Sequence, residues 1–159
     1  MNPLWAVAAI PLLALVALVT GGALVGIEKQ RIRRVARKLA FERSGDTGES
    51  FTQEMLRSGV PADVSGALYS EMNRALEQYE IYAFPARADD ALSAVYGIRL
   101  PGERNDFMDT DLRDIAHGVA RRSGRWVMAV GNELDNQLVK LMSVRDLGRW
   151  ISSLPRVSS

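Results

Sequence analysis

An uncharged segment close to the N-terminus constrains this chain of 159 residues more than any other feature. The segment runs from Pro3 to Ile27 and contains no acidic or basic side chain. A helix rises 1.5 Å per residue, so a helix of this length would measure about 37 Å and could cross a hydrocarbon core of about 30 Å. Its apolar residues surround the whole helix rather than one stripe, which disfavours a buried core helix. We therefore expect residues 1–27 to form a transmembrane anchor.

The charges around this segment predict its orientation. No Lys or Arg precedes position 29, and the apolar core is longer than the roughly 7–15 residues of a signal peptide, so we expect no cleavage. Basic residues then follow, as they do on the cytoplasmic side of membrane helices. We expect a single-pass protein of the cell inner (cytoplasmic) membrane with a cytoplasmic C-terminal domain. Anionic lipid headgroups would contact Lys29, Arg31, Arg33, Arg34, Arg37 and Lys38.

Residues 28–43 continue as a predicted basic juxtamembrane helix. Ile32, Val35, Ala36 and Leu39 recur at helical spacing and form one apolar face. This pattern has two interpretations. The helix either lies along the inner leaflet as an amphipathic helix or is an ordinary basic collar that follows a membrane span.

Two glycines within the apolar segment have the spacing of a membrane-helix packing motif. Gly22 and Gly26 are four residues apart, which allows two helices to approach closely. One interpretation is a homodimer through the membrane helix. The other is that these are simply small residues in an apolar helix.

Composition bounds the remainder of the chain. Residues 44–50 are small and polar and form a predicted linker, which leaves residues 51–159 as one cytoplasmic domain. Residues 45–159 carry thirteen basic and seventeen acidic side chains, so their net charge is −4, which argues against nucleic acid as a partner. The chain has no cysteine, which excludes disulfides, thiolate nucleophiles and Cys-ligated metal sites.

Hydrophobic periodicity predicts a mostly α domain, a bundle of four or five helices. A capping box at Ser50 and Gln53 should begin the first helix, Asp89 should cap the third, and Ser143 should cap the last. Two short apolar stretches separated by a turn indicate a β-hairpin near 126–142. The predicted helices are 51–58, 62–79, 88–95, 110–122 and 144–153.

The order of these elements resembles the acyl carrier protein fold. A long helix is followed by a loop containing Asp89-Asp90-x-Leu92, then by a helix that opens with Met108-Asp-Thr-Asp-Leu112. The last helix is entered by Ser143-Val-Arg-Asp-Leu147. The resemblance covers residues 62–154 and is closest to carrier-like bacterial proteins of unassigned function. It implies a carrier-like bundle tethered to a membrane.

The chain departs from the carrier pattern where the chemistry would occur. A working carrier attaches its phosphopantetheine arm to the serine of an Asp-Ser-Leu motif, whereas this chain has Asp109-Thr110-Asp111-Leu112. We therefore expect no cofactor. Asp109 or Thr110 should instead cap the following helix.

An acidic patch at the start of that helix is the candidate docking surface. In carriers this face docks partner enzymes, so the resemblance implies docking of a protein partner. The alternative is a solvated face that matches the positive end of the helix dipole. The spacing does not fit an EF-hand, so we expect no metal site. The patch consists of Asp106, Asp109, Asp111 and Asp114, and Arg113 interrupts it.

No residue set indicates catalysis. His117 is the sole histidine and falls off the apolar face of its helix, so neither a nucleophilic triad nor a typical zinc site is expected. The basic run Arg121, Arg122 and Arg125 lies at a helix C-terminus, where cations match the dipole or contact lipid.

These observations lead to a hypothesis of a membrane-tethered, non-catalytic helical interaction module, a carrier-like domain without its arm that docks an unidentified protein. Two alternatives belong to other classes. One is a functional membrane-tethered carrier in lipid or secondary-metabolite synthesis. The other is a small enzyme that uses carboxylates alone.

Overall fold

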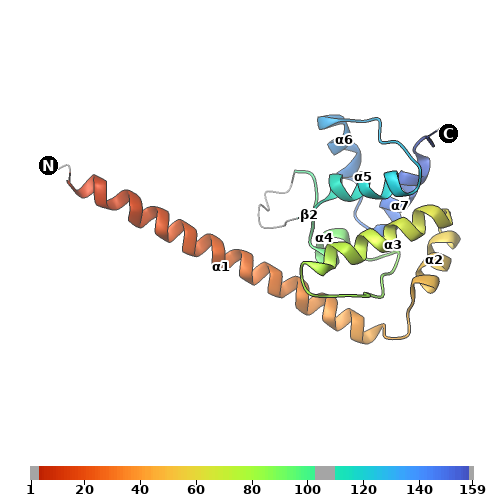
Figure 1. Cartoon of the computed structure of the whole chain (residues 1–159), viewed down its shortest axis with the longest axis horizontal. Helices are drawn as coiled ribbons and strands as arrows, with labels where there is room; N and C mark the ends of the chain where they lie inside the picture. Colours follow the sequence, from red (N-terminus) through yellow and green to blue (C-terminus); the bar gives the residue numbers. More distant parts are fainter. Residues whose placement is uncertain (1–3, 103–109, 158–159) are drawn as a thin grey trace.

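The computed structural model describes the backbone of residues 4–102 and 110–157, and the side chains of this part from residue 23 onward. Within it the chain is mostly helical, as expected, and a single pair of short strands accompanies the helices. The elements are α1 (Leu4–Glu42), α2 (Gly48–Arg57), α3 (Ala62–Glu77), α4 (Leu92–Tyr96), β1 (Ile98–Arg99), β2 (Thr110–Asp111), α5 (Leu112–Arg122), α6 (Gly131–Leu138) and α7 (Val144–Ser153). Figure 1 shows a long helix that leads into a compact bundle.

Helix α1 is continuous for 39 residues, and its N-terminal half extends away from the bundle (Figure 1). The predicted membrane span, residues 3–27, falls mostly within residues 1–22, which lie outside the described side chains, as does Gly22. Gly26 is exposed. Among the residues that could be searched, no helix is sufficiently long and apolar to cross a membrane.

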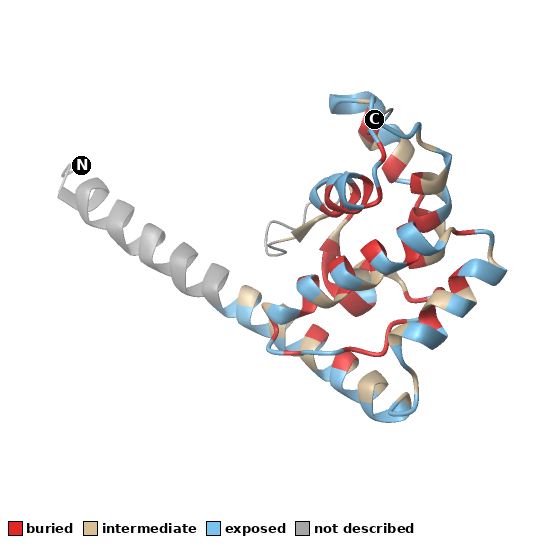
Figure 2. Cartoon of the chain, turned by 45° about the vertical axis from the view of Figure 1, so that its right-hand side comes forward, coloured by how far each residue is buried: buried red, intermediate tan, exposed pale blue. Residues whose placement is uncertain are grey.

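The apolar face of the basic segment is buried against the bundle. Ile32 and Ala36 belong to the same hydrophobic core as the domain, and Leu39 packs against it. Figure 2 shows buried positions on α1 where this helix meets the bundle. Gly97 makes this contact possible, because a Cβ at that position would collide with Ile32 and Tyr79. The interpretation of a helix lying on the inner leaflet is therefore wrong for this face, since periodicity shows that a face is apolar and not what covers it.

A buried ion pair fastens the end of α1 to the segment before α4. Arg43 donates to both carboxylate oxygens of Asp90, at 2.8 and 2.7 Å. Asp90 also accepts from the Tyr96 hydroxyl at 2.9 Å and from the Arg87 backbone N–H at 2.9 Å. The hydrogen bond to Asp90 raises the pKa of Arg43, and burial raises the pKa of Tyr96 well above its usual value.

Helix α7 packs between α2 and α3 and completes the core. A Cβ on Gly148 would lie within 2.6 Å of Met55 and 2.9 Å of Leu68, so the three helices meet at this glycine. The predicted bounds of α7 are confirmed, with Ser143 and Asp146 forming a capping box at its start. Two backbone hydrogen bonds then join α7 to the Asp90 segment, from Val144 to Asp90 at 3.1 Å and from Arg145 to Ala88 at 2.8 Å.

Two helix starts differ from the sequence prediction. The capping box of α2 is formed by Thr47 and Ser50, so the helix begins inside the predicted linker. Helix α4 begins at Leu92 with no side-chain cap, and Asp89 instead pairs with Arg145 at 3.0 Å. At α2 a local capping box forms three residues earlier than expected, and at α4 an ion pair with Arg145 engages the side chain that was expected to cap the helix.

The predicted β-hairpin near 126–142 is wrong. Residues Gly131–Leu138 form α6, which buries Leu134 and Leu138 while Val139 is exposed. The apolar side chains at 134, 138 and 141 repeat at helical rather than alternating spacing. The one strand pair among the described residues is parallel and joins Ile98 to Thr110 and Arg99 to Asp111.

We expect the substitution Arg43→Met to destabilise the fold by about 3 kcal/mol, because it leaves the buried carboxylate of Asp90 without its cation. The matched control is Arg37→Met, since Arg37 is exposed on α1 and has no ion pair among the described residues. The control should change the free energy of unfolding by less than about 0.5 kcal/mol. Urea unfolding of the full chain, followed by circular dichroism, measures both. Equal losses in the two variants would contradict a special role for Arg43.

Candidate functional site

The acidic patch predicted to dock a partner is described only in part, and one of its two described carboxylates is engaged within the domain. Asp106 and Asp109 lie outside the described residues. Asp111 caps α5 by accepting from the Arg113 backbone N–H at 2.9 Å and also binds Arg99 at 2.9 Å. Partial burial raises the pKa of Asp111, but the hydrogen bonds from Arg113 and Arg99 outweigh it and leave the pKa lowered. The other described carboxylate, Asp114, is exposed and makes no hydrogen bond or ion pair with the described residues.

The position that matches the carrier serine has a structural role in this chain. Thr110 lies in β2, where its hydroxyl oxygen accepts a hydrogen bond from the Gln78 side chain at 2.8 Å. The cap of α5 is Asp111 and neither Thr110 nor Asp109, which corrects the sequence prediction by one residue.

The basic residues after the predicted span divide into paired and unpaired groups. Arg31 binds Glu28 at 2.6 Å, Arg33 pairs with Glu80, and Lys38 lies 3.8 Å from Glu42. Lys29 is half-buried. Arg34 and Arg37 are exposed and have no ion pair among the described residues. These two arginines are the best placed of the predicted set to meet an anionic surface.

The main cavity of the described structure lies on the outer face of α5. It has a volume of about 470 Å³. Helix α5 contributes half of the lining residues, which are Asp114, His117, Gly118, Ala120 and Arg121. The segment 125–127 forms one wall, and Arg74 and Val157 complete the lining. The volume falls in the range of small-molecule sites in proteins, about 300–1,000 Å³.

Two carboxylates hold the arginines around this cavity. Glu71, which is 1% exposed, binds Arg74 at 2.7 Å and Arg122 at 2.9 Å. Asp63 binds Arg125 at 2.7 Å and lies 3.4 Å from Arg156. Partial burial raises the pKa of Asp63, but Arg125 outweighs that effect and leaves the pKa lowered. Each carboxylate therefore serves two guanidinium groups.

The wall of the cavity continues into a row of exposed apolar side chains. Trp126, Met128 and Val130 are 63%, 72% and 74% exposed, and we call these three residues the apolar ridge. The intervening Val127 is buried, so burial alternates along the segment as in a strand. The sequence indicated a strand here, but it gave no sign that the apolar side chains would face outward.

The backbone of this segment has an unpaired edge. The N–H of Trp126 donates to Pro155 at 3.0 Å, and Arg125 and Arg156 form a bridge. From Val127 to Val130 the backbone N–H groups donate to no partner among the described residues. An unpaired edge of this kind can accept an additional strand.

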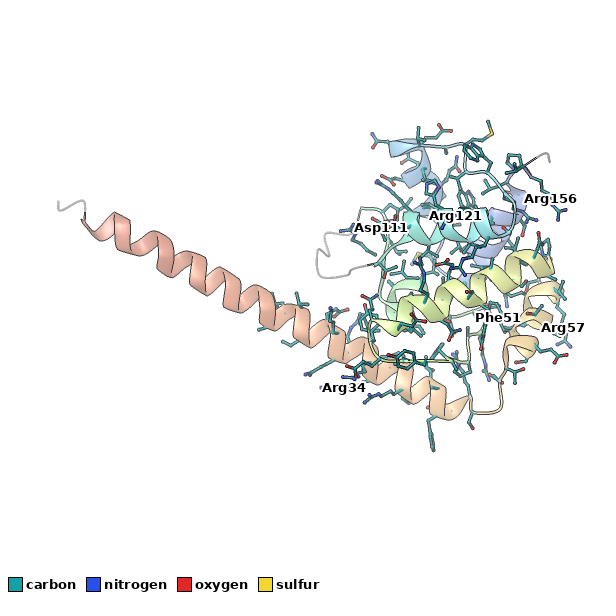
Figure 3. The ribbon with its side chains drawn as sticks, in the orientation of Figure 1. Arg34, Phe51, Arg57, Asp111, Arg121 and Arg156 are labelled. Atoms are coloured by element: carbon teal, nitrogen blue, oxygen red, sulfur yellow. The ribbon has the colours of Figure 1, made fainter. Side chains whose placement is uncertain are left out.

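His117 is exposed at the rim of the cavity. Among the described residues no group of three or more His, Cys, Asp or Glu side chains is placed to hold a metal ion. Arg121, whose side chain is labelled in Figure 3, is exposed beside His117 and has no ion pair within the described part of the chain. The arrangement is therefore cationic and apolar, which suits binding.

Comparisons with protein families, with characterised proteins and with solved structures found no significant match to this chain.

The contact between α3 and α5 beneath the cavity gives a sharp test of the packing. A Cβ on Gly118 would lie 3.0 Å from a carboxylate oxygen of Glu71, which its two arginines hold in place. We expect Gly118→Ala to destabilise the fold by about 1–2 kcal/mol, because the added methyl group overpacks this contact. Thermal unfolding of the full chain measures the change.

The control substitution is Gly66→Ala in α3, where an added Cβ meets nothing within 4 Å. Alanine has a higher helix propensity than glycine, so this variant should gain up to about 1 kcal/mol. If Gly118→Ala gained stability as well, the close packing of Gly118 on Glu71 would be refuted.

Proposed function

We propose that the protein is a membrane-tethered, non-catalytic helical interaction module of the inner membrane, with its domain in the cytoplasm. The observation that carries the proposal is the continuity of α1. Its N-terminal half contains the apolar segment, and its last turns are packed into the core of the domain. A domain fixed to such a helix is held close to the membrane rather than on a flexible linker.

The docking surface that we propose is the apolar ridge and not the acidic patch. Asp111 is committed to the cap of α5 and to Arg99, whereas the ridge exposes three large apolar side chains beside an unpaired backbone edge. Exposed contiguous apolar side chains mark interaction sites. We propose that the occupant is an extended segment of a partner protein, which would add its backbone to this edge and its apolar side chains to the ridge.

The alternative is a functional carrier tethered to the membrane. It rests on the resemblance of residues 62–154 to carrier domains. The hydrogen bond from Gln78 engages the Thr110 hydroxyl oxygen, which disfavours an arm at this position. The intact mass of the protein from its native host separates the two proposals, because a carrier would show the increment of a phosphopantetheine arm.

The absence of cysteine makes the tether testable with single-cysteine variants. We expect Asn2→Cys to react with a membrane-impermeant maleimide in intact cells, because the N-terminus would lie outside. Glu49→Cys, at an exposed position in α2, should react only after the membrane is permeabilised. Immunoblotting of the labelled protein reads out both variants. Labelling of Glu49→Cys in intact cells, or release of the protein by alkaline washing, would overturn the proposed tether.

The apolar ridge can be tested by site-specific photocrosslinking in living cells. Benzoylphenylalanine in place of Met128 should give one discrete adduct, because an extended partner segment would lie within reach of that side chain. The matched control places it at Arg57, which is exposed in α2, an element that contributes no residue to the ridge. The adduct should disappear when Val130 is also replaced by Asp. An adduct that survives Val130→Asp, or one formed equally from position 57, would contradict docking at the ridge.

A further inference from the structure

The cavity on α5 shares Trp126 with the apolar ridge, but its other lining residues give it a chemistry of its own. We propose that it binds a small organic anion, a carboxylate with a compact apolar or aromatic body. This inference goes beyond the proposed tether and partner docking, and it stands on the shape, charge and position of the cavity.

The shape of the cavity fits one small ligand. About 470 Å³ is enough for a molecule with one or two rings, and the cavity opens to solvent on the outer face of α5. Gly118 and Ala120 add no bulky side chain to the lining, and Trp126, Val127 and Val157 make part of it apolar. An aromatic side chain beside aliphatic ones favours a ligand with an apolar body.

The charge of the cavity favours an anion. Three of its lining residues are arginines, whereas Asp114 is the one carboxylate among them. The carboxylates behind the lining do not cancel this surplus, since Glu71 and Asp63 are each shared between two arginines. In total, five arginines and three carboxylates lie in or directly behind the lining. Planar guanidinium groups bind carboxylates with paired hydrogen bonds.

Two arginines of the lining have guanidinium N–H groups that no acceptor among the described residues engages. Arg125 is 4% exposed, and its buried Nε has no hydrogen-bond partner among the described residues. An unsatisfied buried donor is costly, and an anionic oxygen at the inner end of the cavity would give this guanidinium another acceptor. Arg121 is exposed at the rim and has no ion pair in the described part of the chain. The ligand carboxylate is therefore placed between Arg125 and Arg121.

The position of the cavity favours a ligand from the aqueous phase over a lipid headgroup. Figure 3 places Arg121 on α5 and Arg156 near the C-terminus, both on the bundle and away from the N-terminal half of α1. A bilayer that contained the N-terminal half of α1 would not reach this end of the domain.

The test uses the full chain in lipid nanodiscs and the photoreactive carboxylate para-benzoylbenzoate. Irradiation followed by peptide mass spectrometry should place the label on the segment 125–127 or on Val157. The neutral methyl ester of the probe should label this site at least about tenfold less at equal concentration, because it lacks the charge that the arginines bind. Equal labelling by acid and ester would overturn the proposal, as would label confined to α1.

Three variants make the result specific. Arg121→Gln should raise the concentration for half-maximal labelling by about tenfold, which corresponds to the loss of one charge-assisted hydrogen bond. Arg121→Lys should give an intermediate value, since it keeps the charge and loses the planar fork. Arg57→Gln, an exposed arginine outside the cavity, should have no effect. Labelling of Arg121→Gln that matches the unaltered protein would refute the site, and circular dichroism verifies that each variant is folded.

Discussion

The buried ion pair between Arg43 and Asp90 is the interaction on which the rest of the structure depends. Removing two charges from water is expensive, and the pair is tolerated because Tyr96 and the Arg87 backbone fill the remaining acceptor positions of Asp90. The backbone carbonyl of Asp90 also accepts a hydrogen bond from the N–H of Val144, the first residue of α7. One side chain and its backbone thus join the end of α1, the segment before α4 and the start of α7. The long helix is consequently part of the domain and not an appendage to it.

Two other carboxylates, one buried and one partly buried, determine the local charge in another part of the bundle. Glu71 and Asp63 on α3 each bind two arginines that come from α3, α5 or the chain after α5. These contacts fix α5 on α3 and require glycine at position 118. Because each carboxylate binds two arginines, arginines outnumber carboxylates here. The surface above them is therefore cationic, although the domain as a whole is acidic. The overall net charge of the domain therefore says little about this local surface.

The sequence predicted the fold where local signals and burial agree. The apolar stripe of α3 and the Ser143 cap of α7 gave the two helices within about two residues. It failed at α6, because Leu138, Val139 and Leu141 fit an alternating pattern as well as a helical one over so few residues. The sequence did not predict the candidate site, for a different reason. Arg74 is on α3, far in the chain from Arg121 and Arg125, and the three line one cavity only because α3 packs on α5.

The two ends of the bundle then have different tasks under the proposed function. The end that contains Arg43 and Ile32 is joined to α1, so its distance from a membrane that held α1 would be fixed by a helix and not by a linker. Arg121 lies on the bundle, away from the N-terminal half of α1 (Figure 3). Under the proposed function, this rigid connection would hold the cavity at a fixed distance from the lipid surface. If Arg43→Met loosened this connection, the bundle could rotate on α1, and its cationic face would be free to approach anionic lipid. The ion pair would in that case set what the domain can bind as well as how stable it is.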